Sequence, residues 1–138
     1  MDVIDELYQR VAFQIPTEEF IHIIQLLVRK KQDDIDYIKN KIAQYEQKRR
    51  KEEAMYQSLS PIRKLFTGRP PSHHTAVEYM VYVKEPFKKI EVIKREIREL
   101  ARVLKRIEDN PDSDEIMLST HLINQLTQQE REDQIDER

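Results

Sequence analysis

Apolar residues recur three and four positions apart along two long stretches of the chain, the spacing of one buried stripe on an α-helix. The first stretch, residues 17–57, has no glycine or proline inside it and starts at Thr17, a suitable N-cap. The second, residues 75–109, starts with Thr75 and Glu78 at the spacing of a capping box. The pattern therefore predicts two long helices. Their stripe positions are Ile21, Ile24, Val28, Ile35, Ile38, Ile42 and Tyr45, then Ile90, Ile93, Ile97, Leu100, Leu104 and Ile107.

The two stripes match each other when the helices run antiparallel. Aligning Ile42 with Ile90 keeps both stripes in register, although a slip by one heptad also fits. Lys31 and Arg49 lie within the first stripe, where polar residues weaken packing and can fix the register. Pro86 lacks an N–H donor, so it should kink the second helix or loosen one turn. We predict an all-α fold based on a long antiparallel helical hairpin with a coiled-coil-like stalk.

Three shorter helices are predicted around this hairpin, over residues 2–13, 61–66 and 113–127. The first and the last should pack at the base, because residues 20–28 are apolar nearly all round and need more than one neighbour. The short helix that begins at Ser60 and Pro61 should lie at the tip. The sequence thus predicts a single helical domain over residues 1–128, followed by a disordered acidic tail over residues 129–138.

Composition narrows the classes of function. The chain has 138 residues, of which 36% are charged, with one glycine and no cysteine. With Gly68 alone, a Walker loop or a dinucleotide-binding loop cannot be built, and without cysteine there is no disulfide, thiolate nucleophile or cysteine-ligated zinc. No apolar run approaches the roughly 20 residues of a membrane span, and residues 1–13 are too acidic for a signal peptide. These features favour a cytoplasmic protein without a membrane span.

Positive charge is concentrated in the middle of the chain. Residues 46–89 hold ten Lys and Arg against five Asp and Glu, a net charge of +5 in a chain whose total is −2. In a hairpin this region forms the tip, where apolar anchors could enter a groove of a partner while basic residues steer the encounter. A solvated charge run without function is the alternative, since Glu52, Glu53 and Glu78 lie in the same region. The candidate partner-binding residues are Tyr56, Ile62, Arg63, Lys64, Leu65, Phe66, Arg69, His73 and His74.

Metal binding and catalysis find little support in the sequence. His73 and His74, with Glu78 following, resemble half a metal site, but zinc requires three or four protein ligands and no second cluster is visible. His22 and His121 are expected near each other at the base, as histidines at the edge of a packed face. The acidic residues show no Glu-x-x-His spacing, and a two-helix hairpin encloses no pocket. We therefore expect no metal, no cofactor and no enzymatic activity.

The resulting hypothesis is a small helical adaptor or regulatory protein whose partner is another protein. One alternative is a nucleic-acid-binding accessory protein, in which the basic tip contacts phosphates and its tyrosines stack on bases. Another is a structural or assembly component in which the hairpin acts as a spacer. A homodimer is also considered, because Tyr37 and Val92 on an outer face could join two hairpins into four helices.

Overall fold

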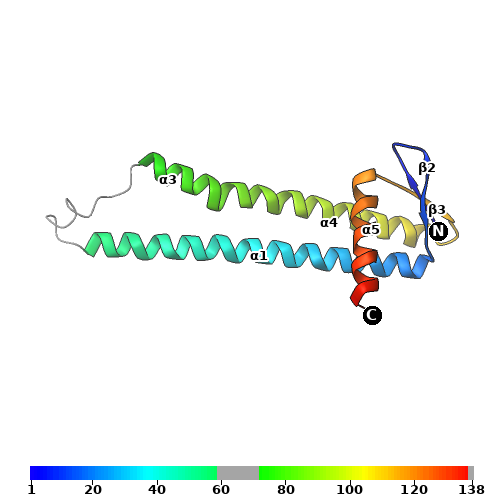
Figure 1. Cartoon of the computed structure of the whole chain (residues 1–138), viewed down its shortest axis with the longest axis horizontal. Coiled ribbons are helices and arrows are strands. Elements are labelled where there is room, and N and C mark those ends of the chain that lie inside the picture. Colours follow the sequence, from blue (N-terminus) through cyan, green and yellow to red (C-terminus); the bar gives the residue numbers. More distant parts are fainter. Residues whose placement is uncertain (59–71, 137–138) are drawn as a thin grey trace. The chain divides into compact units, whose positions relative to one another are not determined.

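The computed structural model describes the backbone of residues 1–58 and 72–136, and the side chains of residues 1–58 and 76–135. Most of these residues are helical (Figure 1). Contacts divide the chain into two compact units: unit 1 comprises Met1–Gln32 and Arg95–Arg138, and unit 2 comprises Asp33–Lys94. In chain order the elements are β1 (Asp2–Asp5), β2 (Arg10–Gln14), α1 (Thr17–Ser58), α3 (Ser72–Tyr79), η1 (Met80–Lys84), α4 (Glu85–Asp109), β3 (Glu115–Leu118) and α5 (Thr120–Asp136).

The two long helical stretches predicted from the apolar spacing are confirmed. Helix α1 starts at Thr17, and Glu18 and Glu19 lie in its first turn, where carboxylates complement the positive end of the helix dipole. It contributes to both units. The second stretch is built from α3, η1 and α4 in succession, which together cover residues 72–109.

A π-helical turn interrupts the second stretch just before Pro86. In η1 the N–H of Glu85 bonds to the carbonyl of Met80, five residues earlier instead of four. Proline in a regular helix removes a hydrogen bond and its ring clashes with the carbonyl four residues back, so a wider turn accommodates it. The loosened turn predicted at this position is confirmed.

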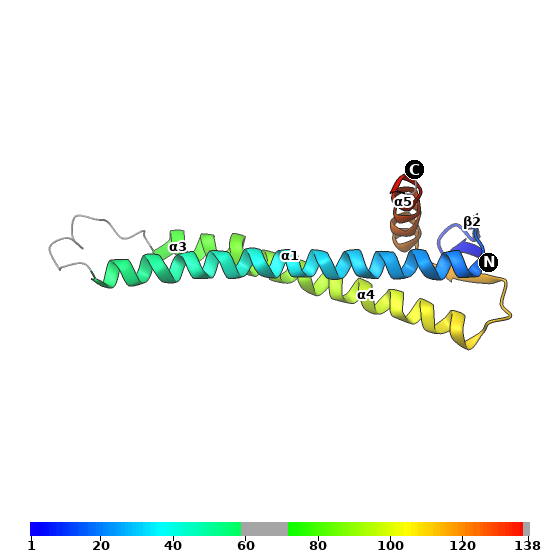
Figure 2. The same cartoon turned by 90° about the horizontal axis from the view of Figure 1, so that it is seen from below.

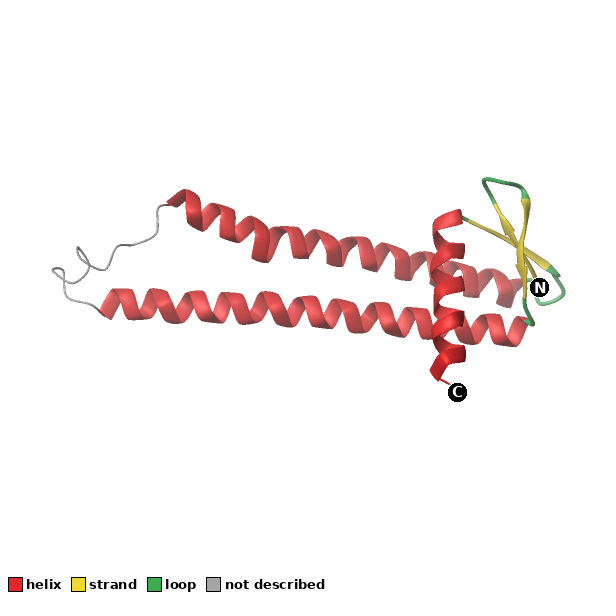
Figure 3. Cartoon of the chain, in the orientation of Figure 1, coloured by secondary structure: helices red, strands yellow, loops and turns green. Residues whose placement is uncertain are grey.

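Unit 1 contains a small β-sheet, so the prediction of an all-α fold is wrong and the chain is mostly helical (Figure 3). The strand order is β2-β1-β3, with β1 antiparallel to β2 and parallel to β3. The helix predicted over residues 2–13 is therefore replaced by β1 and β2. Burial in β1 alternates with a period of two, and Val3 is fully buried while its neighbours are partly exposed, as in a strand with one covered face.

The turn between β1 and β2 is shaped by an aspartate instead of a glycine. Asp5 Oδ1 accepts the N–H groups of Leu7 and Tyr8 at 2.9 and 3.4 Å, and Gln9 takes a φ of 55°. The same oxygen accepts a hydrogen bond from Thr120 Oγ1 at 2.8 Å, at the first residue of α5. Burial alone would raise the pKa of Asp5, but these hydrogen bonds outweigh it and leave the pKa below its usual value. The carboxylate thus fixes both the turn and the start of α5.

The last predicted helix is also corrected. Over residues 113–127 the structure has β3 followed by α5, whose start is capped by Ser119 Oγ accepting the N–H of Leu122 at 3.2 Å. Helix α5 continues to Asp136, through most of the segment for which the sequence predicted disorder. Two perpendicular views show α5 lying across the first part of α1 and the last part of α4 (Figures 1 and 2).

Unit 1 has a closed apolar core between the sheet and its three helices. Phe20, Ile24, Leu100 and Leu126 are among its most buried side chains, and Phe13 of β2 packs edge-on against Phe20. The covering neighbours predicted for residues 20–28 are thus strands as well as a helix. The buried members are Val3, Ile15, Phe20, Ile23, Ile24, Leu27, Leu100, Val103, Ile107, Ile116, Leu118, Leu122, Ile123 and Leu126.

In unit 2, α1 contacts α3 and η1. Tyr45 stacks on Tyr82 with ring centroids 4.8 Å apart, and its hydroxyl donates to Glu78 at 3.2 Å. The alignment of Ile42 with Ile90 would place Tyr45 opposite Phe87, so that alignment is wrong. The alternative slip by one heptad, which would place Tyr45 opposite Met80, stays a prediction. The buried apolar side chains described in unit 2 are Ile35, Val83, Ile90 and Ile93.

The structure does not test the predicted tip helix or the predicted single domain. The tip helix over residues 61–66 lies outside the described residues. The single domain over residues 1–128 stays a prediction, because the contacts divide the chain into two compact units.

Candidate interaction groove

Most of the partner-binding residues predicted at the tip lie outside the described part of the chain. Tyr56 is half-buried near the end of α1 and makes contacts there. His73 and His74 belong to α3, although their side chains are outside the description. The remaining six, Ile62, Arg63, Lys64, Leu65, Phe66 and Arg69, lie outside the described residues. These assignments stay predictions.

A different surface of unit 2 presents apolar side chains to solvent. Tyr37 of α1, Val81 of η1 and Val92 of α4 are 63%, 55% and 47% exposed and line one groove of about 570 Å³. We call this the docking groove. Its full lining is Tyr37, Ile38, Lys41, Val81, Glu85, Pro86, Lys88, Lys89 and Val92.

Val81 belongs to the docking groove because it lies off the buried stripe of the second helical stretch. The stripe of α4, extended backwards at the spacing of a regular helix, includes Val83, which is buried. Val81, two residues earlier, is exposed and lines the groove with Pro86.

Lysines dominate the charged lining of the docking groove. Lys88 lies 3.6 Å from Glu85, one turn earlier on the same helix. Lys41 lies over the ring of Tyr37, with its Nζ atom 5.4 Å from the ring centroid. In the described part of the chain, no carboxylate lies within ion-pair distance of Lys41 or Lys89. The apolar floor is therefore bordered by positive charge.

A second groove in unit 2 is lined by some of the basic residues that the sequence assigned to the tip. Lys48 and Arg49 line it, but Glu52 and Glu78 line it too, which reduces its positive charge. The rings of Tyr45 and Tyr82 stack on each other there, so each ring already has one face covered. Burial, followed by the hydrogen bond to Glu78, raises the pKa of Tyr45. The geometry gives little support to base stacking.

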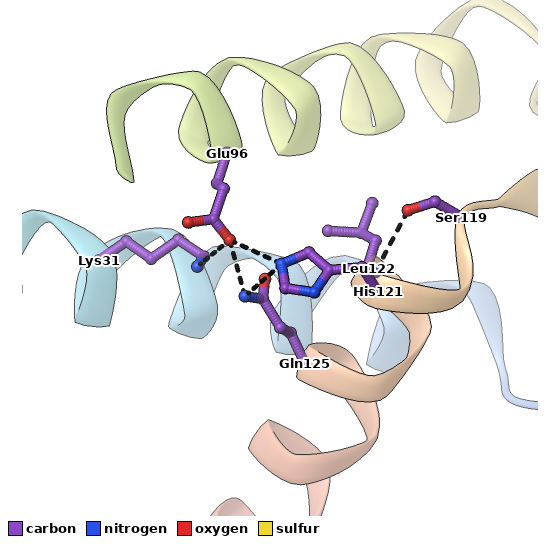
Figure 4. Close-up of polar contacts among 6 residues, drawn as sticks. All are labelled: Lys31, Glu96, Ser119, His121, Leu122 and Gln125. Carbon is purple, nitrogen blue, oxygen red and sulfur yellow. Dashed lines mark hydrogen bonds and ion pairs between the residues drawn. The ribbon is translucent and has the colours of Figure 1, made fainter. Parts of the chain in front are cut away.

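Unit 1 holds a polar cluster centred on Glu96 Oε2 (Figure 4). This oxygen accepts hydrogen bonds from Lys31 Nζ at 3.1 Å and from Gln125 Nε2 at 2.7 Å, and it lies 3.2 Å from His121 Nε2. The side chains of Lys31 and Glu96 are only 9% and 16% exposed, whereas that of His121 is 71% exposed. The cluster links α1, α4 and α5. Lys31, predicted to be a polar stripe residue, therefore pairs with a carboxylate.

The charge state of Glu96 follows from its neighbours. Burial alone would raise the pKa of this carboxyl, but the hydrogen bonds from Gln125, Lys31 and His121 and the charge of Lys31 hold it below its usual value. Glu96 is thus held as a carboxylate that accepts from Lys31 and Gln125 and contacts His121. His121 contacts this group, and the predicted meeting of His121 with His22 has no hydrogen bond or ion pair in the described residues.

Chemistry at a metal ion would need ligands gathered in one place. Among the residues that the structure describes, no three His, Cys, Asp or Glu side chains lie together as a possible metal site. Within residues 1–58 and 72–136, no helix combines the length and apolar character needed to cross a bilayer.

Sequence reasoning found part of the docking groove. Tyr37 and Val92 were expected on an outer face, whereas Val81 was not singled out. Its position off the buried stripe that includes Val83 was the signal that could have found it. Comparison with protein-family models, curated proteins and solved structures finds no match for the chain.

Proposed function

We propose that this chain is a helical protein-interaction module, an adaptor or regulatory protein without catalytic activity, and that it binds its partner through the docking groove. The observation that carries the proposal is the exposure of Tyr37, Val81 and Val92 along one groove. Isolated exposed apolar residues are ordinary on protein surfaces, but apolar residues from two helices that line one concave surface are typical of binding sites.

The mechanism is apolar docking with electrostatic steering. A partner side chain that covers Tyr37 or Val92 removes apolar surface from water, which provides affinity. Lys41 and Lys89 at the border act at longer range and raise the rate of encounter. Mutations on the apolar floor should therefore change the dissociation rate, and mutations of the lysines should change the association rate.

The antiparallel hairpin is part of this proposal. It is supported by the contacts of Tyr45 with Glu78 and Tyr82 in unit 2, and by the contact of Lys31 with Glu96 in unit 1. In unit 2 both helices contribute residues to the lining of the docking groove.

A pair of valine substitutions tests the proposal. Val92→Asp places a charge on the groove floor, and Val77→Asp makes the same change at a valine of α3 that is 58% exposed and lies outside the groove. Tagged full-length wild type and both variants would be used as bait in the native cell. A retained protein would then be purified, and its affinity measured by titration calorimetry.

We expect a protein that binds wild type and Val77→Asp with similar affinity and binds Val92→Asp at least about tenfold more weakly. Circular dichroism would show that both variants keep their helical content. The proposal would be overturned if Val92→Asp and the double variant Tyr37→Ser/Val92→Asp both bound the same protein with unchanged affinity. The absence of any stoichiometric partner after cross-linking in the cell would also overturn it.

A further inference from the structure

We propose that the occupant of the docking groove is an acidic amphipathic α-helix of another protein. This inference rests on the proposed function and adds to it the shape and charge of the partner. Three features of the groove carry it: its walls are helices, its apolar floor extends over about three helical turns, and its border is positively charged.

The helical walls of the groove favour a helical partner over an extended one. The groove is formed by α1 on one side and by η1 and α4 on the other, and helices use their N–H and C=O groups in their own hydrogen bonds. An extended peptide would find no strand edge to pair with, so its backbone groups would lose water without replacement. A helix satisfies its own backbone and needs only side-chain contacts.

The length of the floor fits the repeat of such a helix. Val81 and Val92 are eleven residues apart, which corresponds to about 16 Å along a helix at 1.5 Å per residue. Eleven residues are three turns, so a partner helix could place apolar side chains at positions i, i+4, i+7 and i+11 along the groove. Tyr37 and Ile38 on the opposite wall would contact the same face.

The charge of the lining selects an acidic helix. Three lysines, Lys41, Lys88 and Lys89, oppose one glutamate, Glu85, and so the lining carries a net charge of +2. Glu85 is already compensated by Lys88 at 3.6 Å. A partner with Glu or Asp beside its apolar face would bring carboxylates to Lys41 and Lys89, whereas a basic helix would meet like charges.

The same charge argues against a second copy of this chain in the groove. In a two-fold symmetric dimer the same patch meets itself, so Lys41, Lys88 and Lys89 of one protomer would face those of the other. Like charges opposed across an interface cost binding free energy. The homodimer through Tyr37 and Val92 that the sequence suggested is therefore the less favourable occupant.

Designed peptides test the inference with the full-length chain. Two 18-residue helical peptides would share leucines at i, i+4, i+7 and i+11 and differ only in the flanking positions, which are Glu in one and Lys in the other. Fluorescence anisotropy would give Kd values at low and high salt. We expect the glutamate peptide to bind about tenfold more tightly at low salt, with a smaller difference at high salt.

Charge reversal on the protein supplies the second arm. Lys41→Glu/Lys89→Glu should invert the preference, so that the lysine peptide binds more tightly. Lys39→Glu/Lys84→Glu makes the same change at exposed lysines of α1 and η1 outside the groove and should leave the preference as in wild type. Val92→Asp should weaken both peptides.

Each other result is decisive. Equal affinity for both peptides, lost in Val92→Asp, overturns the charge argument and leaves the proposed function standing. If the chain binds a purified partner through Val92 but binds neither peptide, the inference that the partner is a helix fails. The proposed function then still stands. If sedimentation shows a dimer that Val92→Asp dissociates, the occupant is a second copy. If no peptide and no partner depends on Val92, the proposed function fails as well.

Discussion

A single carboxylate oxygen in unit 1 connects side chains of three helices. Glu96 Oε2 accepts from Lys31 of α1 and Gln125 of α5 and contacts His121 of α5. Because Lys31 is only 9% exposed, its ammonium depends on this carboxylate for its compensating charge. Removing one partner of such a pair leaves a buried charge, which costs more than the intact pair contributes.

Substitution of Glu96 should therefore destabilise the protein well beyond an ordinary surface change. For Glu96→Ala we expect a loss of about 2–3 kcal/mol in the free energy of unfolding, measured by urea denaturation. Glu91→Ala is the matched control, because Glu91 lies 3.7 Å from Lys94 on the exposed side of α4, where an ion pair is worth about 0.5 kcal/mol. Equal losses in the two variants would show that burial of Lys31 has no such consequence.

The lowered pKa of Glu96 also predicts a pH dependence. The folded pKa lies below the ordinary value of 4.5, so the carboxylate stabilises the fold fully above about pH 4.5. That contribution is lost as the pH falls through the folded pKa. The native state favours the ionised carboxylate, and protonation removes the charge that Lys31 pairs with. In urea unfolding between pH 7 and pH 3, stability should fall more steeply below pH 4.5 in wild type than in Glu96→Gln. Parallel curves for the two proteins would contradict this assignment.

At the scale of elements, regular periodicity explains what the sequence could predict. The stripe of α1 spans many turns, so both its bounds and its buried positions Ile24 and Ile35 follow from the apolar spacing. The strands were missed for a different reason. β1 has four residues, too few to separate a period of two from a period of 3.6, and its parallel partner Glu115 is far away in the sequence. Local patterns contain no signal for such a pairing.

The candidate site shows the same limit. Apolar spacing placed Tyr37 and Val92 on an outer face because both lie off the stripes of regular helices. Val81 lines the same groove, two residues before the buried stripe position Val83. The tip residues were selected by charge and apolar content, and most of them, from Ile62 to Arg69, lie outside the described residues.

Replacement of Pro86 should show how far the π-helical turn depends on this one residue. Proline inside a helix costs about 3 kcal/mol, and the wide turn of η1 relieves part of that cost. For Pro86→Ala we expect unfolding in urea to show a gain of about 1 kcal/mol. The new amide at position 86 should be protected from hydrogen exchange. Phe87→Ala, at the exposed neighbouring residue, is the control and should change stability by less than about 0.5 kcal/mol. A loss of stability in Pro86→Ala would mean that packing around Val83 maintains the turn.

At the scale of the whole molecule, the two units differ in how much apolar surface they bury. In the described residues unit 1 has fourteen buried core members, whereas the buried apolar residues of unit 2 are Ile35, Val83, Ile90 and Ile93. Local stability follows buried apolar contact, so segments with few such contacts open more easily than the global unfolding transition. The docking groove lies in the unit with the smaller core.

Unit 2 should therefore open before unit 1 unfolds. In native-state hydrogen exchange at increasing urea, we expect amides of η1 and of the second half of α1 to exchange through an opening of lower free energy than amides of α5 and β1. Leu100→Ala removes a fully buried side chain of the unit 1 core and should cost about 2–5 kcal/mol in global unfolding. Val83→Ala should mainly lower the free energy of the unit 2 opening. If both substitutions shift the exchange of all helices equally, the chain unfolds as one cooperative body. In that case the smaller core gives unit 2 no separate freedom to adapt its groove to a partner.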